Sequence, residues 1–360
     1  MTELVVIRVD SSLQIGTGHV MRCLTLADAL RVNSAEIRFI CRQFEGDLIE
    51  FIRSKDYHVY VLPPGNIQDA DSTEAKTLSH AHWLGATQDD DIQACKPIVK
   101  KYCPDWLIVD HYALDYRWEL ELKDDCRKLM VIDDLADRKH SCDLLLDQTY
   151  GREKNDYEQL VPDTCRLLLG SQYALLRPEF AQWRDYSLKR RTEPQLKKLL
   201  ISLGGADPEN YTGMVLQALA ECDLPEELKI IVVLGPSSPH LATVKQLSGT
   251  LPFKTEVVSN VSNMAELMTD ADLAIGAAGA TTWERCCLGL PSIMLVLADN
   301  QRFIADRISE HHVAIIVYSP LLKGFCGYMK SARKSMRQLS LRCCQLTEGT
   351  GVNLVIRYML

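Results

Sequence analysis

The sequence of 360 residues has no run of about 20 apolar residues, the length that a helix needs to cross a bilayer. It also has no basic excess, since 48 acidic against 40 basic residues give a formal net charge of −8. Nucleic-acid-binding surfaces need clustered lysine and arginine, so this balance argues against a nucleic-acid partner. An anionic ligand stays possible, because backbone N–H groups can hold a phosphate.

No Cys-x-x-Cys pair occurs among the 13 cysteines, although Cys286–Cys287 and Cys343–Cys344 are adjacent. A disulfide framework or a zinc site would need spaced pairs, so scattered buried thiols in a reducing compartment fit better. The N-terminus also lacks a signal-peptide pattern, because Arg8 interrupts the first apolar run. We therefore expect a cytoplasmic protein with structural thiols and with neither a metal ion nor a cofactor.

Short apolar runs alternate with helical patterns along the whole chain. The runs are 4–7, 37–40, 59–62, 106–109, 129–132 and 144–146 in the first half, and 199–203, 230–234, 273–275, 293–296 and 314–317 in the second. Nearly continuous apolar runs of this length are typical of strands buried on both faces of a parallel sheet. The alternation, present in both halves, predicts an α/β protein with two parallel sheets.

The domain boundaries are predicted from composition. We expect an N-terminal Rossmann-like domain over 1–180, a linker over 181–198, a C-terminal Rossmann-like domain over 199–345 and a tail over 346–360. The linker prediction rests on the polar, basic segment 187–198, which contains Pro194 and is typical of an exposed connection between domains.

The first of three glycine-rich turns follows the first predicted strand and opens a helix. Gly16 and Gly18 allow a ligand to approach the backbone, and the helix start offers unpaired N–H groups. The segment is not a dinucleotide-binding pattern, because His19 follows the second glycine and Arg22 lies just past the place of the last small residue. At the carboxyl edge of a parallel sheet, His19 suits a general base; a helix-capping histidine explains the same pattern.

The second turn, Gly204-Gly205-Ala206-Asp207-Pro208, follows the first strand of the second half. Two glycines at a strand-to-helix turn can bring the backbone close to a ligand. A tight turn with Asp207 as the helix N-cap and Pro208 as the first helical residue explains it equally well.

The third turn places small residues and hydroxyls before a glutamate: Gly279, Ala280, Thr281, Thr282 and Glu284. Backbone N–H groups at this helix start would cradle a diphosphate, and Glu284 would accept hydrogen bonds from ribose hydroxyls. The alternative is a turn of small residues that packs under a helix. We favour ligand binding, because hydroxyls and a carboxylate are poor choices for packing alone.

Polar residues follow two further strands. Asn300 and Gln301 precede a helix in the second half, and their amides suit sugar hydroxyls or a helix cap. In the first half, Asp110, His111 and Tyr112 follow a strand, so we expect them near His19, with one of the three only structural.

The motifs together resemble one family. They are the segments 8–12, 15–22, 110–112, 202–207 and 279–284, which occur in order over most of the chain, to about residue 318. The family is the UDP-2,4-diacetamido-2,4,6-trideoxy-β-L-altropyranose hydrolase of pseudaminic acid biosynthesis. The resemblance implies a glycosyltransferase-B fold, in which two Rossmann-like domains face a cleft. It also implies that water replaces UDP at the anomeric carbon of the sugar, with C–O cleavage and inversion.

The predicted site follows from the turns and the resemblance together. The resemblance implies His19 as general base and Tyr112 beside the reacting sugar, with UDP at the third turn and Asn300 on the sugar or phosphate. The predicted substrate-binding residues are Asp10, Gly16, Gly18, Arg22, Gly204, Gly205, Gly279, Ala280, Thr281, Thr282, Glu284, Asn300 and Gln301. The expected ligands are a UDP-sugar and water.

Three other functions stay open: a glycosyltransferase of the same fold, a hydrolysing UDP-sugar 2-epimerase, and a catalytically silent nucleotide-sugar sensor. Two segments fit the resemblance less well. The last 40 or so residues depart from the regular helical segment expected in relatives. His80, His82 and Trp83 are read as a surface loop over the cleft, with a metal site as the alternative.

Overall fold

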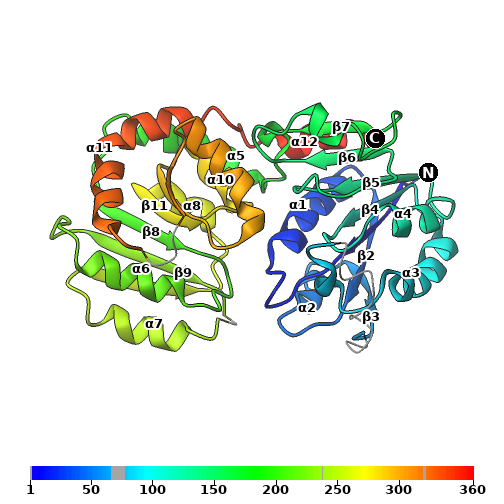
Figure 1. Ribbon diagram of the computed structural model, residues 1–360, viewed down its shortest axis with the longest axis horizontal. Helices are drawn as coiled ribbons and strands as arrows, with labels where there is room; N and C mark the ends of the chain where they lie inside the picture. Colours follow the sequence, from blue (N-terminus) through cyan, green and yellow to red (C-terminus); the bar gives the residue numbers. More distant parts are fainter. Residues whose placement is uncertain (1, 66–77, 237, 319–321) are drawn as a thin grey trace. The chain divides into compact units, whose positions relative to one another are not determined.

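The structure is a computed structural model (Figure 1) that describes residues 2–65, 78–236, 238–318 and 322–360. The chain forms two compact units. Unit 1 comprises Met1–Leu175 together with Gly351–Leu360, and unit 2 comprises Leu176–Thr350. Both are α/β units built on a wholly parallel sheet, which confirms the predicted fold class. None of the helices in the described ranges has the length and apolar character needed to span a membrane.

Unit 1 has, in its described residues, a seven-stranded sheet in the order β3-β2-β1-β4-β5-β6-β7. The strands are β1 (Leu4–Val9), β2 (Glu36–Arg42), β3 (His58–Leu62), β4 (Trp106–Asp110), β5 (Lys128–Ile132), β6 (Leu144–Asp147) and β7 (Arg166–Leu169). The helices are α1 (Gly18–Val32), α2 (Ile49–Arg53), α3 (Gln88–Tyr102), α4 (Tyr116–Lys123) and α12 (Gly351–Ile356), with 3₁₀ helices η3 (Ala81–Leu84), η4 (Lys154–Tyr157) and η5 (Ser171–Tyr173).

The sheet of unit 1 is buried on both faces. Along β1, Val5 and Ile7 belong to one apolar cluster, which also holds residues of α1 and α12, while Val6 belongs to a second cluster with α3 and α4. Successive side chains of a strand point to opposite faces, so an unbroken apolar run is what such a strand requires.

Unit 2 has, in its described residues, a six-stranded sheet in the order β10-β9-β8-β11-β12-β13. The strands are β8 (Lys198–Ser202), β9 (Lys229–Leu234), β10 (Lys254–Ser259), β11 (Leu273–Ala277), β12 (Ser292–Leu295) and β13 (Ile315–Val317). The helices are α5 (Pro178–Arg190), α6 (Tyr211–Ala220), α7 (Leu241–Ser248), α8 (Met264–Asp270), α9 (Thr281–Cys287), α10 (Arg302–Glu310) and α11 (Phe325–Cys343), with the 3₁₀ helix η6 (Asp299–Gln301).

The segment expected as an exposed linker is helical and packed in unit 2. Most of 181–198 lies in α5 and the start of β8. Arg191 is 4% exposed and donates hydrogen bonds to the backbone carbonyls of Leu288 and Ala271, while Arg190 pairs with Asp272 at 2.5 Å. These arginines donate hydrogen bonds to backbone carbonyl groups at helix C-termini that have no partner within the helix. The basic residues of this segment therefore pack within unit 2 and do not form an exposed linker.

The C-terminal segment also differs from the expectation. Residues 325–343 form the regular helix α11, and the predicted tail 346–360 is divided between the two units. In Figure 1, α12 lies beside α1 within unit 1, where the two helices are in contact. Val355 is fully buried there, and the Trp106 indole N–H donates to the carbonyl of Met359 at 3.0 Å.

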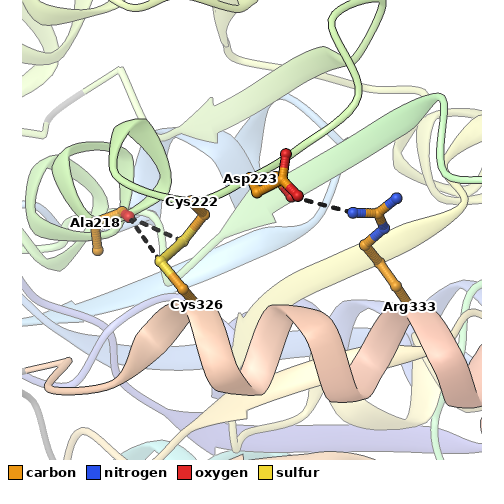
Figure 2. The surroundings of a disulfide bond; sticks show 5 residues. All are labelled: Ala218, Cys222, Asp223, Cys326 and Arg333. Carbon is orange, nitrogen blue, oxygen red and sulfur yellow. Dashed lines mark hydrogen bonds between the residues drawn. A yellow bond between two sulfur atoms is a disulfide. The ribbon is translucent and has the colours of Figure 1, made fainter.

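One pair of cysteines is oxidised, which corrects the expectation that all are thiols. Cys222, just after α6, is bonded to Cys326 in the first turn of α11, across 104 residues of sequence. Figure 2 shows this disulfide beside the carbonyl of Ala218, with Arg333 of α11 donating a hydrogen bond to the carbonyl of Asp223 at 3.1 Å. The disulfide and this hydrogen bond both join α11 to the segment that follows α6.

Candidate functional site

The strand order of unit 1 reverses between β1 and β4, which are neighbours with Val9 opposite Asp110. Ligands of open parallel sheets bind outside the carboxyl ends of the strands at such a reversal. His19 lies in the first turn of α1, which follows β1, and Asp110 ends β4 with Tyr112 two residues later. The topology therefore brings together residues that are about 90 positions apart in sequence.

His19 is held by a buried carboxylate. Its Nδ1 lies 2.6 Å from Asp110 Oδ1, and its side chain is 10% exposed while that of Asp110 is fully buried. An ionised carboxylate can only accept, so Nδ1–H donates to Asp110 and the neutral imidazole keeps its lone pair on Nε2. This arrangement fixes the tautomer and orientation of the His19 imidazole.

Arg22 and Tyr112 complete this cluster around a second carboxylate. The Arg22 guanidinium donates two hydrogen bonds of 2.7 Å to Asp110 and a third to Asp134, and the Tyr112 hydroxyl donates to Asp134 at 2.7 Å. Burial alone would raise the pKa of Asp110, but Arg22 and His19 outweigh it and hold that pKa well below its usual range. Burial, and then Asp134, raise the pKa of Tyr112 far above its ordinary value, so its hydroxyl keeps its proton.

Asp10 and His111 face inward, which corrects the prediction of Asp10 as a ligand contact. Asp10 is 1% exposed; its Oδ1 lies 2.5 Å from Arg8 and accepts the Arg42 backbone N–H at 2.7 Å. His111 Nε2 lies 3.3 Å from Asp10 Oδ2, and its Nδ1 accepts the Ala113 N–H. His111 is thus the structural member of the Asp110–Tyr112 triplet. Arg22, with its three donor nitrogens engaged, supports His19 and Asp110.

The first turn is open around its glycines. Gly16 has φ +78°, a conformation that favours glycine, and a Cβ added at Gly16 or Gly18 would meet no atom within 4 Å. Thr17, the N-cap of α1, makes no side-chain capping bond, so the N-terminal amides of α1 have no side-chain cap at this residue. The geometry fits the prediction of a ligand-approachable turn.

The segment that the sequence analysis reads as a surface loop over the cleft supplies aromatic neighbours of His19 and Tyr112, although the sequence does not specify these contacts. His80, just before η3, and Trp83, within η3, lie beside the ring of Tyr112, with centroid distances of 5.5 Å for His80 and 5.7 Å for Trp83. The centroid of Trp83 also lies 6.2 Å from that of His19. Histidine and tryptophan in a predicted loop were the only signal. No group of three or more His, Cys, Asp or Glu suited to a metal occurs in the part of the chain that the structure describes, so the metal alternative at His80 and His82 has no support there.

The strand order of unit 2 reverses in the same way between β8 and β11, where the second and third turns begin. Gly204 has φ +117° with open space around it, and the Gly235 N–H donates to the Gly205 carbonyl at 2.8 Å. The N-cap of α6 is Asn210, which corrects the prediction of Asp207 as N-cap, and α6 begins three residues later than predicted. The Asp207 carboxylate accepts the backbone N–H groups of Tyr211 and Thr212.

The third turn is only partly free to bind an anion. The Thr282 N–H donates to the Gly279 carbonyl at 2.8 Å, which corrects the prediction that this amide faces a ligand. The amides of Gly279 and Ala280 have no acceptor among the described residues, and a Cβ added to Gly279 would meet no atom within 4 Å. Two amides and an open glycine therefore remain for a ligand.

A buried cation lies beneath the third turn. Arg285 is 2% exposed and donates to the Ala277 carbonyl at 2.9 Å and to the hydroxyls of Thr281 and Thr282, each at 3.2 Å. It forms no ion pair with any residue in the described ranges, and burial lowers its pKa. A buried positive charge without a direct ion pair, under open backbone amides, favours a negatively charged ligand at the turn.

The remaining predicted residues lie at the edges of this region. Glu284 is half-buried, and burial raises its pKa to about 7, against the opposing effects of Arg177 and Arg285. The side-chain oxygen of Gln301, the last residue of η6, accepts the N–H of Leu297, two residues before η6 begins, at 2.9 Å. Asn300 is half-exposed within η6, and its side chain is free to contact a ligand.

Known proteins resemble this chain in sequence over part or most of its length. The profile of the glycosyltransferase family 28 C-terminal domain matches residues 200–319. An uncharacterized protein of Methanocaldococcus jannaschii is 28% identical over 88% of this chain, which spans 60% of that protein. The UDP-2,4-diacetamido-2,4,6-trideoxy-β-L-altropyranose hydrolase of Campylobacter jejuni is also 28% identical, over 85% of this chain and 96% of its own length.

Solved structures show the fold. MurG of Acinetobacter baumannii matches with a TM-score of 0.68 at 14% identity, covering 100% of this chain and 99% of its own. The rhamnosyltransferase SpnG, complexed with thymidine diphosphate, matches with a TM-score of 0.69 at 14% identity, covering 100% of both chains. UDP-GlcNAc 2-epimerase of Neisseria meningitidis reaches 0.64 at 11% identity, over 100% of this chain and 99% of its own. The chain has a glycosyltransferase-B fold.

Proposed function

We propose that the protein hydrolyses a UDP-linked 2,4-diacetamido-2,4,6-trideoxy sugar, in the biosynthesis of a nonulosonic acid such as pseudaminic acid. Water attacks the anomeric carbon and UDP leaves, with C–O cleavage and inversion. The Campylobacter relative, whose name states this reaction type, supports the proposal because the alignment covers nearly its whole length. The observation that carries it is the pairing of His19 Nδ1 with the buried Asp110 carboxylate.

His19 is the general base in this proposal. Its Nε2 accepts a proton from water as the water oxygen bonds to the anomeric carbon, and the electron pair of the breaking C–O bond leaves with UDP. Asp110 keeps Nδ1–H in place and stabilises the imidazolium that forms. Tyr112, whose hydroxyl is committed to Asp134, positions the ring of His19, which lies edge-on to it at 4.6 Å between centroids.

Unit 2 binds UDP in this proposal. The free amides of the third turn and the positive charge of Arg285 stabilise the diphosphate as it departs. Glu284, one turn further into α9, accepts hydrogen bonds from the ribose hydroxyls. UDP is a good leaving group, so the protein needs to stabilise its charge and hold one water, and needs little acid catalysis.

The test incubates the purified protein with the UDP-linked diacetamido-trideoxy sugar in isotopically labelled water without an acceptor, and follows the products by NMR and mass spectrometry. The expected result is release of UDP with the label on the sugar and an inverted anomer. Label on the phosphate, or no release of UDP, would contradict the proposal.

His19→Leu tests the assignment of the base. We expect kcat to fall by about 10²–10⁴-fold while the dissociation constant of UDP, measured by calorimetry, stays unchanged. The physical reason is that the substitution removes the proton acceptor in unit 1 and leaves the residues assigned to UDP untouched. Turnover at the wild-type rate would show that His19 is not the base.

Two other reactions are supported by the fold comparisons. The likeness to MurG and SpnG favours a glycosyltransferase, which would release UDP rapidly only when an acceptor is added. The likeness to the Neisseria enzyme favours a hydrolysing 2-epimerase, whose sugar product would have the opposite configuration at carbon 2. NMR of the product distinguishes both from the proposed hydrolysis, and binding of UDP without any turnover would indicate a nucleotide-sugar sensor.

A further inference from the structure

Gly65, three residues after β3, and Gly85, the residue after η3, lie against each other. A Cβ added at Gly65 would lie 1.8 Å from the carbonyl oxygen of Gly85, so the two glycine backbones touch. Gly85 has φ +64°, and a Cβ there would lie 2.7 Å from the ring of Phe44. Gly65 requires glycine because a side chain there would force its backbone away from that of Gly85, and Gly85 favours glycine because its φ is positive and the Phe44 ring lies against it. The close contact fixes the C-terminal end of η3 on the body of unit 1.

Further contacts hold η3 itself. Leu84 is 1% exposed and belongs to the apolar cluster on the α3 and α4 side of the sheet. The Trp83 N–H donates to the His80 carbonyl at 2.9 Å, and the Ala81 N–H donates to that of Leu78 at 3.1 Å. Residues 78–85 are thus a packed turn of helix whose side chains have defined positions.

Two side chains of this turn form an aromatic wall, which we define as His80 and Trp83. The Trp83 ring stacks on Tyr112 with an interplanar angle of 23°, and His80 lies edge-on to Trp83 with centroids 4.6 Å apart. Trp83 also lies edge-on to His19 at 6.2 Å. The wall therefore borders the histidine that carries the proposed reaction.

The wall is aromatic, uncharged and partly open to solvent. His80 and Trp83 are both half-exposed, whereas Tyr112 behind them is buried. Burial lowers the pKa of His80, and the charges of His82, Arg138 and His19 act in the same direction against Asp137, so the imidazole is neutral near pH 7. Half-exposed aromatic rings beside a reactive group are typical of ligand-contacting surfaces, and they favour apolar groups of a ligand over hydroxyls.

We propose that the aromatic wall makes the enzyme selective for a deoxy, N-acylated sugar, with Trp83 contacting a methyl substituent of the sugar bound beside His19. This inference rests on the function proposed above. A methyl group gains from contact with an indole ring, whereas a hydroxymethyl group at the same place would lose its water without a hydrogen-bond partner. Apolar surfaces discriminate groups of this size by about 10–200-fold.

The experiment compares two ligands in Trp83→Ala. The first is the UDP-linked diacetamido-trideoxy sugar, measured as kcat/KM, and the second is UDP-N-acetylglucosamine, which carries a hydroxymethyl group, measured as a competitive inhibitor. We expect Trp83→Ala to lower kcat/KM for the deoxy sugar by about 10–100-fold and to change inhibition by the hydroxylated sugar by less than about 3-fold. Trp83→Phe, which keeps an aromatic face, should restore most of the loss.

Trp183→Ala is the matched control. Trp183 is a half-exposed tryptophan on α5 of unit 2 that pairs edge-on with Tyr186, so its removal should leave both measurements unchanged. If Trp83→Ala lowers kcat/KM for the deoxy sugar and inhibition by the hydroxylated sugar equally, or changes neither, Trp83 has no role in selectivity. Turnover by the wild type would still support the hydrolase in that case. Absence of UDP release in the wild type would instead refute the proposed function and this inference with it.

Discussion

The guanidinium of Arg285 packs against the backbone of Gly276 at the end of β11, beside the start of the third turn. A Cβ added at Gly276 would lie 2.3 Å from Arg285 Nη1, because the guanidinium crosses the end of β11. The same addition at Gly279 meets nothing within 4 Å. A substitution at Gly276 therefore tests packing against Arg285, and a substitution at Gly279, three residues later, tests the approach of a ligand.

We expect Gly276→Ala to destabilise the protein by about 1–3 kcal/mol, since the new methyl group must displace a buried guanidinium. Gly279→Ala should leave the free energy of unfolding unchanged within about 0.5 kcal/mol. If the turn holds a diphosphate, Gly279→Ala should still weaken UDP binding, because the methyl group occupies the space that the ligand approaches. Urea unfolding and calorimetry with UDP measure both effects, and unchanged UDP binding in Gly279→Ala would argue against a diphosphate at this turn.

Glu284 makes stability depend on pH near neutrality. Its pKa of about 7 in the folded protein lies above the ordinary value of 4.5, so the folded state binds more protons than the unfolded state between these pH values. The stabilisation is complete below pH 4.5 and is lost as the pH rises through 7. Glu284→Gln should remove a fall on the order of 3 kcal/mol in the free energy of unfolding across this window. Parallel pH profiles for wild type and variant would contradict the raised pKa.

At the scale of elements, the predicted apolar runs coincide with every interior strand of the two sheets, such as β1, β4 and β9, and with the edge strands β3 and β13. The edge strands β7 and β10 are not among the predicted runs. β10 reads Lys-Thr-Glu-Val-Val-Ser, because a partly exposed edge strand needs no unbroken apolar run. β7 has only a short run of three leucines after Arg166. Basic residues at 189–191 were read as a linker, because composition alone does not show that buried carbonyl groups accept their hydrogen bonds.

The part of the candidate site that lies at the carboxyl ends of parallel strands was predictable from the sequence. His19, Asp110 and Tyr112 were expected together because parallel strands end at one edge, and the structure brings them together. Asp10 directly follows β1 but pairs inward with Arg8 and with the backbone of Arg42 on the neighbouring strand, which the sequence pattern does not indicate. Trp83 reaches His19 through the return of the chain at Gly65 and Gly85, which no local pattern indicates.

The Cys222–Cys326 disulfide ties α11 to the segment after α6, and its removal tests that link. It closes a sequence separation of 104 residues, for which chain entropy gives a stabilisation of up to about 5 kcal/mol, with 2–4 kcal/mol typical. We expect Cys222→Ser to lower the unfolding midpoint in oxidising buffer and to have little effect in reducing buffer. Cys103→Ser, at an exposed free cysteine, is the control. Mass spectrometry that finds no linked peptide pair would contradict the bond.

At the scale of the whole molecule, residues 351–360 belong to unit 1 although all of unit 2 precedes them in sequence. Met359 is 3% exposed in the apolar cluster of β1 and α1, while the next residue, Leu360, is 56% exposed. We expect Met359→Ala to cost about 2–5 kcal/mol and Leu360→Ala to cost less than about 0.5 kcal/mol. In Met359→Ala, hydrogen exchange should show reduced protection of the backbone amides of β1 and β2 and unchanged protection of those of β8 and β9. Equally reduced protection in both sheets would contradict the division into units.

The return of α12 to unit 1 has a consequence for biosynthesis. A ribosome delivers β1 to β7 first, yet Val352, Val355 and Met359 of their apolar cluster emerge only after every strand of unit 2. Domains usually fold in the order of their translation. Unit 1 is therefore incomplete until residues 351–360 have been synthesised after unit 2. Until then, the nascent chain exposes the apolar surface of unit 1 that α12 covers next to α1.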